Sequence, residues 1–235
     1  MAEPATLREQ MEAALSSAAT EADLRALMMA AVGQPEAATT AAAAPEPEPQ
    51  VPRIILDCDP GGDDVVAMFW LLAMQSQKAC KVLAVTTTQG NVKAPLTFAA
   101  ADKVLTLLSS VVDADIPVCA QTPLDARWGS STERSASRSR YASEMAKNTV
   151  NDGTSLDDAA HIHGCDGMGG LGSQLPARGD YSSAPESYER LIEELKAAPH
   201  QVTVLATGPL TNLADAERAS PGILKLAKRV RAASC

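Results

Sequence analysis

Four acidic side chains lie within eight residues in the stretch "DCDPGGDD", residues 57–64, directly after the apolar run Ile54–Leu56. Asp57 and Asp59 have the i, i+2 spacing that places side chains on the same side of an extended segment. One Asp at a helix start would be an ordinary cap, but capping alone does not explain four acids around Pro-Gly-Gly. Carboxylates this close either raise one another's pKa or hold a cation, and a hard divalent ion such as Ca²⁺ or Mg²⁺ suits oxygen ligands. The stretch therefore predicts a metal or polyol site.

The elements that would position these acids alternate between strand and helix. Strands are expected at residues 53–59, 81–91, 116–120 and 201–208, and helices at 63–76, 95–111, 187–198 and from 209 onward. The strands are apolar runs rather than strict alternations, which is typical of a parallel sheet covered on both faces. We therefore expect an α/β fold, a Rossmann-like open, mainly parallel sheet with helices on both faces.

Three polar motifs stand at the carboxyl ends of expected strands. "DCDPGGDD" ends the first, "TTTQGN" the second, and "ATGPLTN" the later one. Ligands of open parallel sheets bind at these ends. The three motifs should therefore converge on one rim.

Two segments differ from this pattern. Residues 1–50 form a low-complexity extension rich in Ala, Pro and Glu, which we expect to be partly helical or disordered, with a docking or oligomerisation helix as the alternative. Residues 51–235 would form the domain, interrupted at about 126–160 by a polar insertion rich in Ser and Arg. We predict a mobile loop there.

Composition narrows the class of protein. A net charge of −9 argues against a nucleic-acid-binding surface. The five cysteines are scattered without a CxxC pair, which suggests structural free thiols in a reducing compartment. The chain shows neither an apolar run of about 18 residues nor a leader pattern, so we expect no membrane partner and a cytoplasmic location.

The motifs resemble a known enzyme family. "ILDCDPGGDDVVA" resembles the N-terminal signature of the inosine-uridine preferring nucleoside hydrolases. "VLAVTTTQGNV", "HIHGCDGMGG" and "VTVLATGPLTNLA" resemble three further motifs of that family in the same order, over roughly Pro52–Lys228. The resemblance implies hydrolysis of the N-glycosidic bond of ribonucleosides to ribose and free base, assisted by Ca²⁺.

The resemblance also implies a role for each matching residue. Asp59 would be the catalytic base that activates a water held by the metal. Taken singly, His163 is as readily a turn-stabilising residue, Asn91 an ordinary turn residue, and Thr207 part of a helix start. The implied roles are metal ligation by Asp59, Asp64 and the Thr207 backbone carbonyl, substrate binding by Asp63, Asn91 and His163, and support by Asp57.

The sequence departs from the family at its end. Members continue well beyond Cys235 with a further strand, a sugar-binding segment and a late His-Asp pair that completes the calcium shell. Here "RVRAASC" stands where the next strand would begin, and its tail does not look like a strand. We therefore expect a truncated domain that lacks the C-terminal part of the fold, and an activity weakened or lost.

Two other functions stay open at this point. An Asp-x-Asp after a first strand also suits a haloacid-dehalogenase-like phosphohydrolase with Mg²⁺, although Pro60-Gly61-Gly62 and the pair Asp63-Asp64 count against it. A non-catalytic module that uses part of the fold for binding is the third hypothesis. The expected partner is a small ribonucleoside, and homo-oligomerisation is left open.

Overall fold

The computed structural model describes residues 51–233 except 110–111, 113–114, 124–125 and 148–158. The chain divides into two units, Met1–Pro49 and Gln50–Cys235, and all the described residues belong to the second. The helix and linker predicted within residues 1–50 lie outside the described residues.

A five-stranded sheet with the order β3-β2-β1-β4-β5 forms the centre of the domain. Every neighbouring pair of strands is parallel, so the predicted α/β class is confirmed. The segment that stands where a next strand would begin does form one, since Arg229–Ala232 pair with β4 as an exposed outer strand. The strands are β1 (Arg53–Cys58), β2 (Lys81–Thr87), β3 (Val118–Cys119), β4 (Val202–Ala206) and β5 (Arg229–Ala232).

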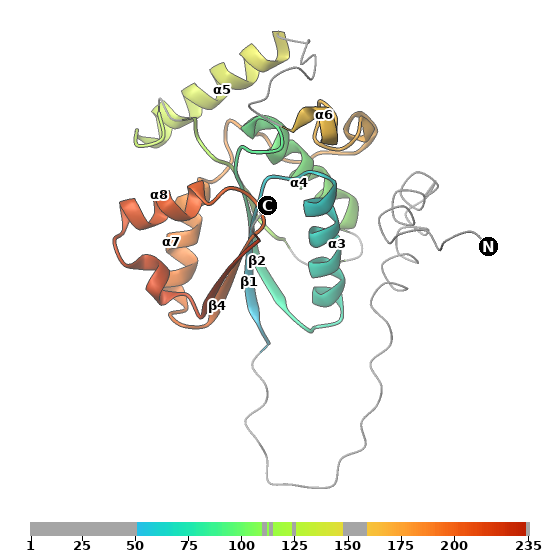
Figure 1. The fold of residues 1–235 in the computed structure, drawn as a ribbon. Helices are drawn as coiled ribbons and strands as arrows, with labels where there is room; N and C mark the ends of the chain where they lie inside the picture. The colour runs from blue at the N-terminus through green and yellow to red at the C-terminus, as the bar shows by residue number, and fades with distance from the viewer. Residues whose placement is uncertain (1–50, 110–111, 113–114, 124–125, 148–158, 234–235) are drawn as a thin grey trace, which may run out of the picture. The chain divides into compact units, whose positions relative to one another are not determined.

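Helices cover both faces of the sheet, as the apolar strands predicted (Figure 1). On one face, Met68 of α3 (Gly62–Ser76) and Leu105 of α4 (Ala94–Leu108) border the same small apolar space as Leu56 of β1. On the other face, α7 (Ser187–Ala197) and α8 (Thr211–Ala219) pack in one cluster with β4. Shorter elements are α6 (Ala160–His163) and the 3₁₀ turns η1 (Leu171–Gln174) and η2 (Ile223–Leu226).

The apolar core explains why the central strands are uninterrupted runs of Val, Ile and Leu. Ile55 of β1, Val204 of β4 and Leu191 of α7 are each 0% exposed. Full burial of one such side chain contributes roughly 1.5–3 kcal/mol. The core therefore fixes the sheet, and with it the edge at which the polar motifs end.

The polar segment predicted as a loop instead contains a helix, α5 (Ser131–Lys147). Its start is a capping box, in which the Glu133 carboxylate accepts the Ser130 N–H at 2.7 Å and the Ser130 hydroxyl accepts the Glu133 N–H at 3.3 Å. The prediction of a loop was wrong over residues 131–147 because the segment lacks apolar periodicity. The S-x-x-E pattern "SSTE" was the signal that could have found the helix.

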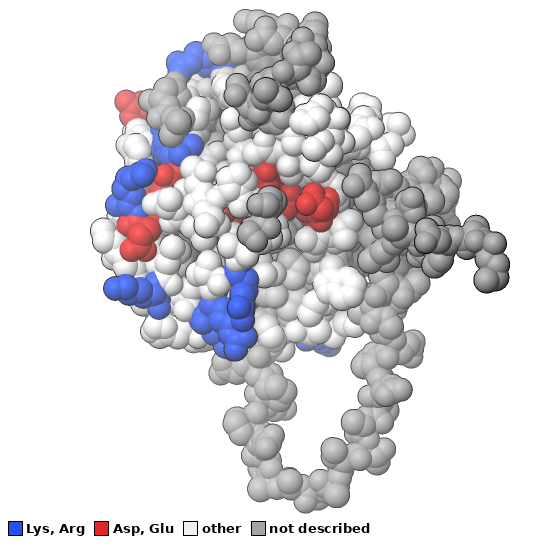
Figure 2. All heavy atoms as spheres, viewed as in Figure 1, with Lys and Arg blue, Asp and Glu red and all other residues white. Residues whose placement is uncertain are grey.

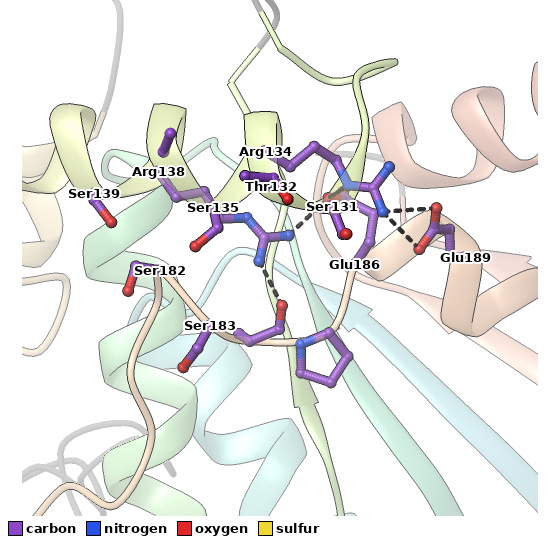
Figure 3. Close-up of a pocket in the computed structure, with 13 residues that line it drawn as sticks. Ser131, Thr132, Arg134, Ser135, Arg138, Ser139, Ser182, Ser183, Glu186 and Glu189 are labelled. Carbon is purple, nitrogen blue, oxygen red and sulfur yellow. Dashed lines mark hydrogen bonds and ion pairs between the residues drawn. The ribbon is translucent and has the colours of Figure 1, made fainter.

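Arginine rather than an apolar stripe attaches α5 to the domain. Arg138 is only 3% exposed, and its guanidinium pairs with Glu186 at 2.7 Å and donates to the Ala120 carbonyl at 2.8 Å. Figure 3 shows Arg134 and Arg138 pointing from α5 toward the segment that leads into α7, where Arg134 meets Glu189. Opposite charge and carbonyl oxygen make burial of this polar face tolerable.

A pocket of about 680 Å³ lies beside this arginine cluster, lined by residues of α5 and of Ser182–Glu189. Both arginines that line it are already paired with carboxylates and backbone carbonyls. We therefore regard the pocket as a gap where α5 packs against the segment before α7, and we assign it no ligand.

Among the residues that the structure describes, no helix has the length and apolar character needed to cross a bilayer.

Candidate active site

The three polar motifs meet at the carboxyl edge of the sheet. Asp57 of β1 pairs with Thr86 of β2 and Ala206 of β4, so the residues after each strand emerge side by side. In Figure 2 acidic side chains stand near the upper end of α3 among mostly uncharged atoms. The predicted convergence of the motifs on one rim is confirmed.

Asn91 joins the two carboxylates predicted to ligate a metal. Its backbone N–H donates to Asp59 Oδ2 at 2.7 Å, and its side-chain Nδ2 donates to the Asp59 backbone carbonyl at 2.8 Å. The same Nδ2 lies 3.3 Å from Asp64 Oδ2. Asp59 and Asp64 are therefore held around one asparagine, as the shared turn suggested.

Thr207 reaches the same place from the end of β4. Its backbone N–H donates to the Asp57 carbonyl at 2.8 Å. The buried atoms Thr207 Oγ1, Asp64 Oδ1 and Asp57 Oδ2 have no hydrogen-bond partner within the described residues. Buried oxygen atoms without partners are costly unless something else satisfies them.

Three acids of the turn, Asp57, Asp59 and Asp64, have pKa values above the ordinary value of an aspartate. Burial raises the pKa of Asp57 to about 7 despite hydrogen bonds from Asn212 and Thr86. Burial also raises the pKa of Asp59 to about 7, and the neighbouring Asp64 carboxylate adds to the rise. The pKa of Asp64 is also raised by burial, and the Thr207 hydroxyl, which lies near the carboxylate but outside hydrogen-bond geometry, opposes the rise. Burial is the largest cause of all three raised pKa values, and repulsion between the neighbouring carboxylates adds to it.

The two remaining predicted substrate-binding residues stand beside this turn. Asp63 lies in the first turn of α3 with an exposed side chain. His163 of α6 accepts the Gly62 N–H through Nδ1 at 3.2 Å. In the neutral ring Nδ1 is then the acceptor and Nε2 carries the proton. His163 thus stabilises the turn and also borders the acids.

The glycine-rich loop after His163 is held by a single carboxylate. Gly164, Gly167, Gly169 and Gly170 all have positive φ, a region that glycine enters at little cost. Burial acts to raise the pKa of Asp166, yet that pKa lies below its ordinary value because backbone N–H groups of residues 168, 170 and 172 donate to it. Asp166 therefore fixes the conformation of this loop beside the acidic turn.

The sequence profile of the inosine-uridine preferring nucleoside hydrolases matches residues 54–232. This chain belongs to that family. A probable uridine nucleosidase of Arabidopsis thaliana is 34% identical over 174 residues, which cover 74% of this chain and 44% of the relative. A pyrimidine-specific ribonucleoside hydrolase of Shewanella sp. (strain MR-7) is 33% identical over 163 residues, covering 68% of this chain and 40% of the relative.

Solved nucleoside hydrolases share the fold. A plant nucleoside hydrolase superposes with a TM-score of 0.53 at 26% identity, over 77% of this chain and 47% of that chain. A purine-preferring ribonucleoside hydrolase from Gardnerella vaginalis gives a TM-score of 0.55 at 20% identity, which supports the fold alone. The chain spans less than half the length of these four relatives, with 40–48% of each covered.

The oxygen atoms at this rim fit a metal ion only in part. Within the described ranges, no three His, Cys, Asp or Glu side chains are grouped as a metal centre. The carboxylates of Asp59 and Asp64 do lie around one asparagine, and buried oxygen atoms of Asp64 and Thr207 lack partners. Oxygen-only donors of this kind fit part of the shell of a hard cation. The residues therefore fit a cation incompletely from side chains alone.

Asn212 is a site residue that the sequence analysis missed. Its Nδ2 donates to Asp57 Oδ1 at 2.7 Å, and Thr86 donates to the same oxygen at 2.6 Å. Asn212 stands 155 residues from Asp57 in the chain. Its place at the end of the "GPLTN" motif is the signal that could have found it.

The position of Asp57 also bears on the phosphohydrolase alternative. A nucleophilic aspartate must reach its substrate, whereas Asp57 is 0% exposed. The family match and the burial of Asp57 together count against an aspartyl nucleophile at this position. Among the described cysteines, Cys58, Cys80 and Cys119 are buried free thiols, whereas Cys165 is an exposed free thiol in the glycine-rich loop.

Proposed function

We propose that this member of the nucleoside hydrolase family hydrolyses the N-glycosidic bond of ribonucleosides with the help of Ca²⁺. The observation that carries the proposal is Asn91 holding Asp59 and Asp64 together beside buried oxygen atoms without partners. The names of two relatives, a uridine nucleosidase and a pyrimidine-specific ribonucleoside hydrolase, support a ribonucleoside as the substrate.

Asp59, Asp64 and Thr207 would hold the cation. When bound, Ca²⁺ would supply positive charge that orients the ribose diol and makes the attacking water more acidic. The oxygen-only donor set, with buried oxygen atoms of Asp64 and Thr207 that lack hydrogen-bond partners, supports this assignment.

Asp59 would act as the general base. Its Oδ2 is held by the Asn91 N–H, so the carboxylate is oriented before substrate arrives. Asp59 would take a proton from the attacking water while the water oxygen bonds to the anomeric carbon and the N-glycosidic bond breaks. The nucleobase would leave with the electron pair of that bond and take up a proton from solvent.

The neighbouring residues would hold the sugar. Asp63 has an exposed carboxylate at the start of α3, where it can accept a ribose hydroxyl. The transition state of glycoside hydrolysis has oxocarbenium character, which nearby carboxylates stabilise. Asn91 and His163 each form a hydrogen bond with a backbone group of the acidic turn. We assign them the remaining contacts to the sugar.

Three expectations drawn from the sequence stay predictions. They are a reduced or absent activity in residues 1–235, a cytoplasmic location and self-association. An assay of base release with and without Ca²⁺ tests the first of these together with the proposal.

Removal and return of Ca²⁺ tests the proposal directly. We expect Ca²⁺ added to the EDTA-treated chain to raise its Tm, because a ligand at 100 times its Kd stabilises the folded state by about 2.7 kcal/mol. Free base should appear from uridine or inosine with Ca²⁺ and not with EDTA. The chain is assayed in parallel on p-nitrophenyl phosphate. Phosphatase turnover without base release, or no response to Ca²⁺ in either measurement, would contradict the proposal.

Gly90 gives a second prediction, because it lies against the proposed base. A Cβ at Gly90 would stand 2.0 Å from Asp59 Oδ2, so Gly90→Ala must displace that carboxylate. We expect Ca²⁺ affinity, measured by isothermal titration calorimetry, to fall about 10- to 100-fold. Gly62→Ala is the matched control, since a Cβ there meets nothing within 4 Å. Equal affinities for the two variants would refute the role given to Asp59.

A further inference from the structure

A chain of buried amide side chains links the acidic turn to the end of β3. Asn212 donates to Asp57 Oδ1 at 2.7 Å, and its own Oδ1 accepts Gln121 Nε2 at 3.4 Å. Gln121 Oε1 accepts the backbone N–H of Gln89 at 3.0 Å. Asp57, Asn212 and Gln121 are 0%, 1% and 4% exposed. Water therefore cannot replace these bonds without opening the structure.

Two backbone groups determine how both amides are turned. The Gln89 N–H can only donate, so the oxygen of Gln121 faces it and the NH₂ of Gln121 faces Asn212. At the other end, Asn212 Nδ2 also donates to the Thr87 carbonyl at 3.0 Å, and a carbonyl can only accept. Flipping either amide would set like groups against each other. The NH₂ of Asn212 is thereby directed at Asp57.

Gln121 also holds the turn that carries Asn91. Gln89, whose N–H it accepts, stands two residues before Asn91. The backbone N–H of Asn91 is the donor to Asp59 Oδ2. One side chain from the end of β3 thus supports both the acid inside the sheet and the turn that orients the proposed base.

We propose that Gln121 is a positioning residue for the cation-binding acids, acting through Asn212 on Asp57 and through Gln89 on the turn of Asn91. Gln121 itself would touch neither cation nor substrate. The inference rests on the proposed function in taking Ca²⁺ as the cation. Partners of this kind around metal ligands commonly change metal affinity 10- to 100-fold when they are replaced.

The test compares two glutamines in the full chain. Gln121→Met removes both hydrogen bonds while nearly conserving volume. Gln75→Met is the matched control, because Gln75 Oε1 also accepts a backbone N–H, that of Val82 at the amino end of β2 and away from the rim. We expect Gln121→Met to weaken Ca²⁺ binding 10- to 100-fold in calorimetry after EDTA treatment. Gln75→Met should lower Tm but leave the Kd within about threefold, well below the 10-fold loss typical of such partners.

A second readout does not need the cation. In EDTA, the amide of Asn91 should exchange with solvent faster in Gln121→Met than in wild type, and at the wild-type rate in Gln75→Met, as followed by NMR. If the wild-type chain binds no Ca²⁺, the proposed function fails, whereas faster Asn91 exchange in Gln121→Met still supports the positioning role. Unchanged exchange at Asn91 overturns the inference, and so does a wild-type Kd for Gln121→Met in a chain that binds Ca²⁺.

If Gln121→Met does not fold, Gln121→Glu replaces it. This variant retains an acceptor for the Gln89 N–H and loses the donor to Asn212. It should keep the Asn91 amide protected and still weaken Ca²⁺ binding. A wild-type Ca²⁺ affinity in Gln121→Glu would show that Gln121 does not act on Asp57 through Asn212.

Discussion

Replacing Asp59 with asparagine is expected to lower kcat for base release from uridine or inosine by about 10²- to 10⁴-fold, the usual contribution of a positioned general base. In the wild-type chain the Asn91 N–H donates to Asp59 Oδ2 at 2.7 Å. Asparagine at position 59 keeps an oxygen that can accept this bond, so the turn should keep its shape. The variant loses two properties of Asp59. It can no longer accept a proton from water, and it no longer presents a negative charge to the cation. Base release is followed by its absorbance change under saturating Ca²⁺.

Asp115→Asn is the control for this change in charge. Its side chain is fully exposed and meets Arg178 at 3.7 Å, away from the rim. An exposed pair of this kind contributes little, so this variant should keep the wild-type kcat. A kcat for Asp59→Asn within tenfold of wild type would show that Asp59 is not the base.

Replacing Arg138 with methionine is expected to lower the free energy of unfolding by about 3–5 kcal/mol, the usual effect of breaking a buried ion pair. All three guanidinium nitrogens of Arg138 are engaged, with Thr122 at 3.0 Å, the Ala120 carbonyl at 2.8 Å and Glu186 at 2.7 Å among the partners. The variant would leave the buried Glu186 carboxylate with only Thr122 and the more distant Arg134. Urea denaturation, read as the shift of the midpoint at constant slope, gives the measurement.

Two further variants separate charge from packing. Lys196→Met removes an exposed cation from α7 and should change stability by no more than about 0.5 kcal/mol. Adding Glu186→Gln to Arg138→Met removes the stranded charge and should recover part of the loss. If the double variant is less stable than the single one by the full cost of Glu186→Gln alone, the two side chains are independent and the ion-pair explanation fails.

The sequence predicted the sheet because its signals are local. Apolar runs such as Ile54–Leu56 and the helix that begins after Gly61 each express burial over a few neighbouring residues. The acidic turn was equally visible, since four carboxylates in eight residues need a common explanation. The helix at Ser131–Lys147 escaped because its buried side is made by Arg138, a residue type that periodicity arguments count as exposed.

By itself the sequence determined the strands and helices from β1 to β3 and from α7 to α8, the glycines of the acidic turn and the edge at which Asp59, Asn91 and Thr207 would meet. Only the tertiary structure decided which polar partners hold them. Asn212 meets Asp57 across 155 residues, and Gln121 meets Asn212 across 91. Hydrogen bonds between such distant segments leave no periodic trace in the chain, because each partner is chosen by the folded backbone groups around it.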